Sequence, residues 1–111
     1  MLTLPIKKKW FDMIVRGEKK EEYREITPYY TTRFMSIGLL DENGNATENE
    51  ACLTLRNGYG RNRPEVTVLV TLFKSQGLPQ WGAEEGKIYY ALRILGMYAD
   101  IKFRLSHEYP Y

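Results

Sequence analysis

The sequence has almost none of the residues that build disulfide frameworks or metal centres. Its 111 residues include one cysteine, Cys52, and one histidine, His107. A single cysteine cannot close a disulfide within the chain, and these two residues are too few for a four-ligand zinc site. We therefore expect no metal site. A chain without disulfides is typical of a protein of the reducing cytoplasm, which is the location we expect.

Long apolar runs and a strong net charge are missing as well. The first six residues are followed at once by Lys7, Lys8 and Lys9, so the sequence predicts neither a signal peptide nor a membrane partner. With 16 Lys and Arg against 14 Asp and Glu, the formal net charge is +2. This mild excess neither requires nor excludes a polyanionic partner, so the local distribution of charge has to decide.

The chain is, by contrast, well supplied with apolar and aromatic residues. Hydrophobic residues make up 43% of it and aromatic residues 14%, including nine tyrosines. This length and composition predict one globular domain over residues 1–111. Tyrosine joins an apolar ring to a polar tip, so it suits both β-sheets and half-solvated binding sites.

Hydrophobic periodicity predicts an α+β domain whose sheet curls into a small barrel. Residues 2–6 alternate as an edge strand does, and Pro5 has no N–H to donate. Residues 7–16 fit a short amphipathic helix that ends at Gly17, and Thr27 followed by proline predicts the start of a second helix. Segment 41–50 is polar and predicts an exposed hairpin tip. The other strands are expected at 21–25, 37–40, 51–56, 65–74, 88–95 and 101–105.

A charged group follows the first predicted helix. In a strand that begins near Glu21, Glu22 and Arg24 point to the same face, whereas alternation does not fix the direction of Lys19. Arginine can grip a phosphate or carboxylate, lysine supplies a charge or a base, and glutamate accepts a proton or a base-edge N–H. The spacing alone also fits an ordinary solvated segment with a local Glu–Arg pair.

The same residues carry a family resemblance. The stretch Gly17-x-Lys19-x-x-Glu22-x-Arg24 resembles the G-x-K-x-x-E-x-R signature of ASCH domains, which belong to the PUA-like superfamily and are common in bacteria and their phages. The likeness extends over most of the chain, apart from residues 41–50 and the C-terminal tail. Three later segments contribute to it: Pro28 to Tyr30, Arg56 to Tyr59 and Pro79 to Gly82.

The resemblance implies a β-barrel with two short flanking helices and a basic, tyrosine-lined cleft that binds RNA or a nucleotide. One branch of the family hydrolyses the acetyl amide of N4-acetylcytidine-type nucleosides with a lysine, a threonine and a later glutamate. Lys19 matches the lysine, Glu22 stands at the threonine position, and Glu84 or Glu85 lies in the region of the later glutamate. A binding module is therefore the leading hypothesis. The alternative is a small hydrolase for a modified nucleoside, with Lys19 and Glu22 as its catalytic groups.

A basic loop provides a second group of candidates. Segment 56–63 holds three arginines, two glycines and Tyr59. Glycine lets backbone N–H groups approach an anion, arginine pairs with phosphate, and tyrosine stacks on a base. We expect Arg56, Asn57 and Tyr59 to contact the ligand, although a hairpin loop whose glycines make turns has the same pattern. Neither a Walker loop nor a dinucleotide fingerprint is present, so we expect no cofactor.

Further aromatic residues complete the prediction. Tyr29, Tyr30 and Arg33 lie on the second predicted helix, with Tyr29 and Arg33 on one face of it. This group either closes the cleft over a base, or its two tyrosines pack under the barrel. Trp81, in a glycine-rich loop, either stacks as a lid or pins that loop to the core. If the charged groups only solubilise a surface, the domain is structural or binds another protein. The predicted ligand-binding residues are Lys19, Glu22, Arg24, Tyr29, Arg33, Arg56, Asn57, Tyr59 and Trp81.

Overall fold

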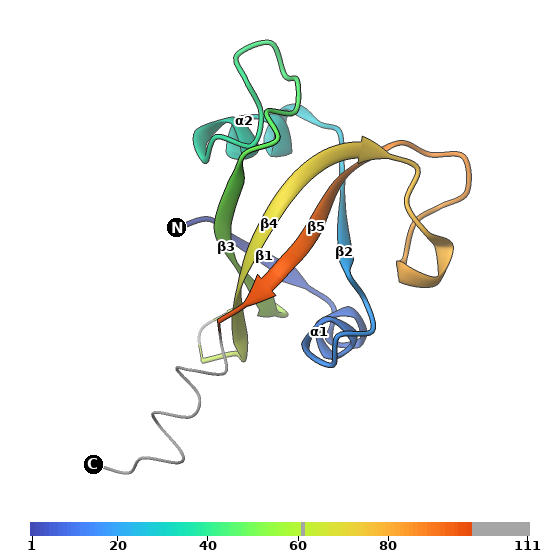
Figure 1. Cartoon of the computed structure of the whole chain (residues 1–111). Coiled ribbons are helices and arrows are strands. Elements are labelled where there is room, and N and C mark those ends of the chain that lie inside the picture. Colours follow the sequence, from blue (N-terminus) through green and yellow to red (C-terminus); the bar gives the residue numbers. More distant parts are fainter. Residues whose placement is uncertain (61, 99–111) are drawn as a thin grey trace.

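The computed structural model describes residues 1–60 and 62–98 (Figure 1). In this part of the chain, five strands form one curled sheet in the order β1-β3-β4-β5-β2, a half-barrel with α1 and α2 at its opposite ends. The α+β class and the barrel-like curl predicted from the sequence are confirmed. The elements are β1 (Thr3–Ile6), α1 (Lys8–Val15), β2 (Glu21–Glu25), α2 (Pro28–Ser36), β3 (Glu50–Asn57), β4 (Glu65–Ser75), a 3-10 turn η1 (Pro79–Trp81) and β5 (Tyr89–Met97).

The start of α2 and the end of α1 lie where their local signals predict. Thr27 caps α2, because its side chain accepts a hydrogen bond from the Tyr30 amide, and proline occupies the first helical position. After α1, Gly17 has φ of +79°, a left-handed conformation that favours glycine at a helix end. Phe11 and Ile14 form the buried face of α1, so this short helix is held by packing against the sheet.

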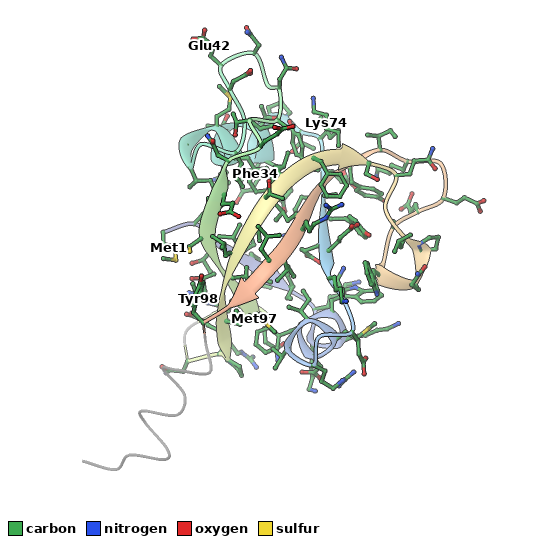
Figure 2. All side chains as sticks on the ribbon, in the orientation of Figure 1. Met1, Phe34, Glu42, Lys74, Met97 and Tyr98 are labelled. Carbon is green, nitrogen blue, oxygen red and sulfur yellow. The ribbon has the colours of Figure 1, made fainter. Side chains whose placement is uncertain are left out.

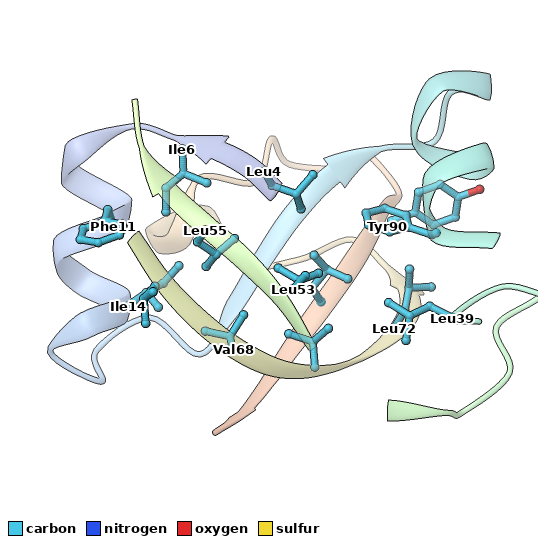
Figure 3. Packing of buried hydrophobic residues seen from close by; sticks show 14 of the residues in the cluster. Leu4, Ile6, Phe11, Ile14, Leu39, Leu53, Leu55, Val68, Leu72 and Tyr90 are labelled. Carbon is cyan, nitrogen blue, oxygen red and sulfur yellow. The ribbon is translucent and has the colours of Figure 1, made fainter. Parts of the chain in front are cut away.

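The core fills the concave face of the sheet. Along β4, the residues Val66, Val68, Val70 and Leu72 are buried, while the residues between them are partly exposed. This alternation follows from the two-residue period of a strand, and it agrees with the strand predicted at residues 65–74. Figure 3 shows these side chains meeting those of α1, β1 and β3 in one cluster, with the Tyr90 ring at the α2 end.

The curled sheet does not close, because its two edge strands do not pair with each other. β1 pairs in parallel with β3, and β2 pairs antiparallel with β5 at the other edge. The register of β4 and β5 shifts at Leu69 and Val70, an irregularity of the kind that bends a sheet. Across the gap, Arg24 Nη2 of β2 donates to the Pro5 carbonyl oxygen of β1 at 2.9 Å. A side chain therefore spans the opening where a closed barrel would have backbone hydrogen bonds.

One predicted strand is wrong. Residues 37–40 form the exit from α2 and make only an isolated bridge, from Leu40 to Ala46. Gly38 has φ of +81°, and the amides of Leu39 and Leu40 both turn back to the Phe34 carbonyl. The apolar run is explained by burial, because both leucines belong to the core.

The acidic segment 41–50 is exposed, as predicted, but it is a turn closed by the isolated Leu40–Ala46 bridge rather than the tip of a hairpin. The amides of Asn43 and Asn45 donate to the Asp41 side chain, and Glu42 lies at the tip beyond α2 (Figure 2). The strand predicted at 101–105 lies outside the described residues. No helix in residues 1–60 and 62–98 is long and apolar enough to cross a membrane.

Candidate functional site

A cleft of about 600 Å³ opens at the gap between the two edge strands. Its walls come from β1 and the start of α1, from β2 and the start of α2, from the β3–β4 loop, and from residues 82–89. Such a volume lies within the usual range for small-molecule sites. Five aromatic residues line it: Trp10, Tyr23, Tyr30, Tyr59 and Tyr89.

Glu22 and Arg24 lie in this cleft on the inner face of β2. They stand opposite Leu92 and Tyr90 of β5, which both belong to the buried core. Glu22 Oε2 accepts from Arg24 Nη2 at 2.7 Å, and the two side chains are 9% and 10% exposed. Arg24 Nη1 also donates to the Tyr30 hydroxyl at 3.2 Å. Burial acts to lower the pKa of Arg24, but the negative charge of Glu22 and the hydrogen bonds to Tyr30 and Glu22 together outweigh it, so the pKa is raised and the guanidinium stays charged.

Lys19 lies beneath this pair and is only 2% exposed. Its Nζ donates to the carbonyl oxygens of Glu21 and Trp81, each at 2.7 Å, and lies 3.2 Å from Glu22 Oε1. Burial lowers the pKa of Lys19, while the charge of Glu22 opposes that shift. All three contacts are acceptors only, so the ammonium form uses its three hydrogens in holding β2 to the loop at Trp81.

Segment 76–88 covers the outer face of β2 and closes the side of the cleft. The Tyr23 hydroxyl donates to Glu21 Oε1 and accepts from the Leu78 amide, at 2.8 and 3.0 Å. Burial and the bond to Glu21 raise the pKa of Tyr23. Glycines permit the close approach: a Cβ on Gly77 would stand 2.9 Å from the Tyr23 ring, and one on Gly82 would stand 3.0 Å from Trp10.

The charge of the lining is mixed, whereas the sequence led us to expect a basic cleft. Lys7 and Arg24 face three carboxylates, those of Glu22, Glu25 and Glu84. Glu25 is paired with Lys87 at 2.8 Å, just outside the lining. Positive charge is therefore concentrated on Arg24 and Lys7 rather than spread over the walls.

Most of the aromatic rings already contact a cation of the protein itself. Lys9 and Lys19 lie over Trp10, Lys19 lies over Tyr23, Arg24 over Tyr30 and Lys87 over Tyr89, with cation-to-centroid distances between 4.6 and 5.6 Å. Tyr59 is different, because no described cation lies over its ring and it is 82% exposed. Its ring is therefore the aromatic surface of the cleft that is open to a ligand.

The structure gathers some of the predicted site residues and separates others. Glu22, Arg24 and Tyr59 line the cleft, and Lys19 lies beneath it in contact with Glu22. The others lie outside the lining: Tyr29, Arg33, Arg56, Asn57 and Trp81.

Local contacts hold the residues that lie outside. Arg33 stacks on Tyr29, with the guanidinium carbon 3.3 Å from the ring centroid, and both belong to the outer side of α2. Arg56 pairs with Glu65 across the β3–β4 hairpin at 2.8 Å. Trp81 contributes its backbone carbonyl oxygen to Lys19, and its side chain does not line the cleft.

The predicted ligand-binding residues omit several that line the cleft, among them Trp10, Tyr30 and Tyr89. Trp10 lies in the amphipathic helix expected over residues 7–16, and Tyr30 was expected to act together with its neighbour Tyr29. The signal available was helical periodicity, which puts adjacent residues about 100° apart and so on different faces. Nothing local marks Tyr89, because its place depends on the pairing of β5 with β2.

No family model, curated protein or solved structure matches this chain. The described residues also contain no cluster of three or more His, Cys, Asp or Glu side chains that could hold a metal ion.

Proposed function

We propose that the cleft between β1 and β2 binds a nucleotide, either free or as one unit of an RNA strand. The observation that carries this proposal is the combination of an open aromatic ring, Tyr59, with a buried Glu22–Arg24 pair in one cleft of about 600 Å³. An exposed tyrosine offers a base a stacking surface of the kind that RNA-binding proteins use for unpaired nucleotides.

The polar pair supplies complementary hydrogen-bonding groups. Glu22 only accepts and Arg24 only donates, so together they suit a ligand that carries both donors and acceptors, such as the hydroxyl and phosphate groups of a nucleotide. Both side chains are held by further contacts, Glu22 by Lys19 and Arg24 by the Pro5 carbonyl. Such support keeps a binding group in a fixed geometry before the ligand arrives.

We further propose that the half-barrel is a PUA-like barrel of the ASCH type. Support comes from the signature Gly17-x-Lys19-x-x-Glu22-x-Arg24, whose three charged residues meet in one network at the opening of the barrel. The order of two short helices among the strands agrees with it.

The hydrolase alternative receives less support. It requires a Lys19 amine that is neutral and reaches the substrate, whereas Nζ is buried and held by three acceptors. Glu22 is likewise committed to two cations. We therefore carry binding forward as the proposed function.

A pair of exposed tyrosines provides the test. Tyr59 lines the cleft, and Tyr29 lies outside it with 56% of its surface exposed. Titration calorimetry with the four ribonucleoside 5′-monophosphates and a short single-stranded RNA should show binding to the wild-type protein. Tyr59→Ala should weaken the preferred ligand roughly 5- to 100-fold, as loss of one base–aromatic stack does. Tyr29→Ala should leave the affinity unchanged.

Two results would contradict the proposal. One is a wild-type protein that binds none of these ligands at millimolar concentration. The other is equal loss of affinity in Tyr59→Ala and Tyr29→Ala, which would place the binding surface outside the cleft.

A further inference from the structure

The network at the floor of the cleft has more positive than negative charge. Lys19 and Arg24 share one carboxylate, that of Glu22, and the three side chains are between 1% and 10% exposed. This excess is confined to the buried network, because the cleft lining as a whole has two cations, Lys7 and Arg24, against three carboxylates. A buried charge without a counter-charge is costly, so an anionic group of a ligand would be favourable here.

Arg24 has hydrogen-bond donors to spare. A guanidinium carries five N–H groups, and the described residues accept three of them, at Glu22, Pro5 and Tyr30. Nε is buried and has no acceptor among those residues. A buried donor left without a partner is rare in folded proteins and calls for an explanation, of which an acceptor brought by a ligand is one.

Tyr30 provides a second donor beside Arg24. Its hydroxyl oxygen accepts from Arg24 Nη1, which leaves the hydroxyl hydrogen directed elsewhere, and no acceptor for it lies among the described residues. Tyr30 belongs to the first turn of α2, and Thr27, the cap of that helix, also lines the cleft. The N-terminal end of a helix carries partial positive charge, which adds to the charge of Arg24.

We propose that Arg24 and the Tyr30 hydroxyl form an anion subsite at the α2 end of the cleft, which takes the phosphate of the bound nucleotide. This inference rests on the proposed function. Lys7 and Tyr59 line the cleft from the start of α1 and from the β3–β4 loop, away from α2. The ligand is thus oriented with its phosphate at α2 and its base against Tyr59.

The test compares each nucleoside with its 5′-monophosphate, and both with inorganic phosphate alone. We expect the monophosphate to bind at least tenfold more tightly than the nucleoside. Tyr30→Phe keeps the ring, which packs on Phe34, and removes only the hydroxyl, so it should reduce this advantage to threefold or less. Tyr29→Phe makes the same change one residue away, outside the cleft, and should keep the full advantage.

Each outcome separates this inference from the function on which it rests. If nucleosides bind and phosphate adds nothing, the anion subsite is wrong and the nucleotide-binding cleft stands. The subsite is also wrong if the tighter binding of the monophosphate over the nucleoside survives in Tyr30→Phe and disappears in Lys7→Ala. The phosphate would then lie at the α1 end of the cleft. If nucleosides and nucleotides fail to bind while inorganic phosphate binds and is lost in Tyr30→Phe, the subsite stands without the proposed function. Failure of all three ligands overturns both.

Discussion

Two Arg–Tyr pairs lie on either side of α2. They have the same composition but differ in burial and in hydrogen-bond partners. The inner pair is Arg24 and Tyr30, and the outer pair is Arg33 and Tyr29. The two tyrosines are adjacent in sequence, with ring centroids 5.0 Å apart. The outer arginine lies closer to its ring, at 3.3 Å against 5.6 Å for the inner one.

The surroundings, rather than the contact itself, distinguish the two pairs. Arg24 is nine-tenths buried and donates to groups from three elements: Glu22 of β2, Pro5 of β1 and Tyr30 of α2. Arg33 donates to the Tyr29 carbonyl of its own helix. The inner pair therefore depends on how strands and helix are assembled, whereas the outer pair would form in the isolated helix.

The largest effect is expected from removing the charge of Glu22. Glu22→Gln keeps the shape of the side chain but leaves Lys19 and Arg24 as two buried cations without a carboxylate. We expect the free energy of unfolding to fall by about 3–5 kcal/mol, measured by chemical denaturation. Glu65→Gln, in the exposed Arg56–Glu65 pair, should change it by less than about 1 kcal/mol. Equal effects at the two sites would show that the inner network is not buried in solution.

The second-largest loss of stability is expected from replacing Arg24, for which Arg33 is the matched control. Arg24→Met removes hydrogen bonds to a carboxylate and to a carbonyl oxygen on the opposite edge strand. It should lower the free energy of unfolding by about 2–3 kcal/mol, less than Glu22→Gln because Lys19 and Glu22 still neutralise each other. Arg33→Met should stay within about 0.5 kcal/mol of the wild type. A larger loss of unfolding free energy in Arg33→Met than in Arg24→Met would contradict the view that the inner pair holds the fold together.

The smallest effect concerns the response to alkaline pH. The pKa of Tyr23 is raised in the folded protein above its ordinary value of 10.0, so the folded state keeps a proton that the unfolded state loses. The stability that this provides is fully present below pH 10 and is lost as the pH rises above it. In denaturation series between pH 9 and 11, Tyr23→Phe should therefore lose stability less steeply than the wild type. A parallel pair of curves would contradict the raised pKa, and Tyr29→Phe controls for loss of a hydroxyl at an exposed position.

The comparison also explains which parts of the site were predictable. The faces of Glu22 and Arg24 followed from strand alternation, and the Tyr29–Arg33 pair from helix periodicity, because both patterns are local. Helical periodicity also puts Tyr29 and Tyr30 on different faces of α2, but local patterns did not reveal which of these faces lines the cleft. Nor did they distinguish the arginines of the 56–63 loop, where Arg56 is paired with Glu65 across the hairpin.

The secondary structure shows the same division. The Thr27 cap marked the start of α2, Gly17 marked the end of α1, and alternation marked β4. The strand expected at 37–40 was wrong because its apolar residues are buried by the chain turning back on α2. A run of apolar residues indicates that a segment is buried. It does not indicate whether the backbone of that segment is a strand or a turn, which depends on the surrounding structure.

By itself, the sequence determined the helices, most of the strands and the shared face of Glu22 and Arg24, since these depend on hydrogen bonds and side-chain periods within a few residues. Only the tertiary structure decided that β1 and β2 face each other across an open barrel. That arrangement buries Lys19 under Glu22, connects Arg24 to Pro5 and leaves Tyr59 exposed at the cleft. The physical reason is that burial and long-range pairing arise from contacts between residues far apart in the chain, which no local pattern specifies.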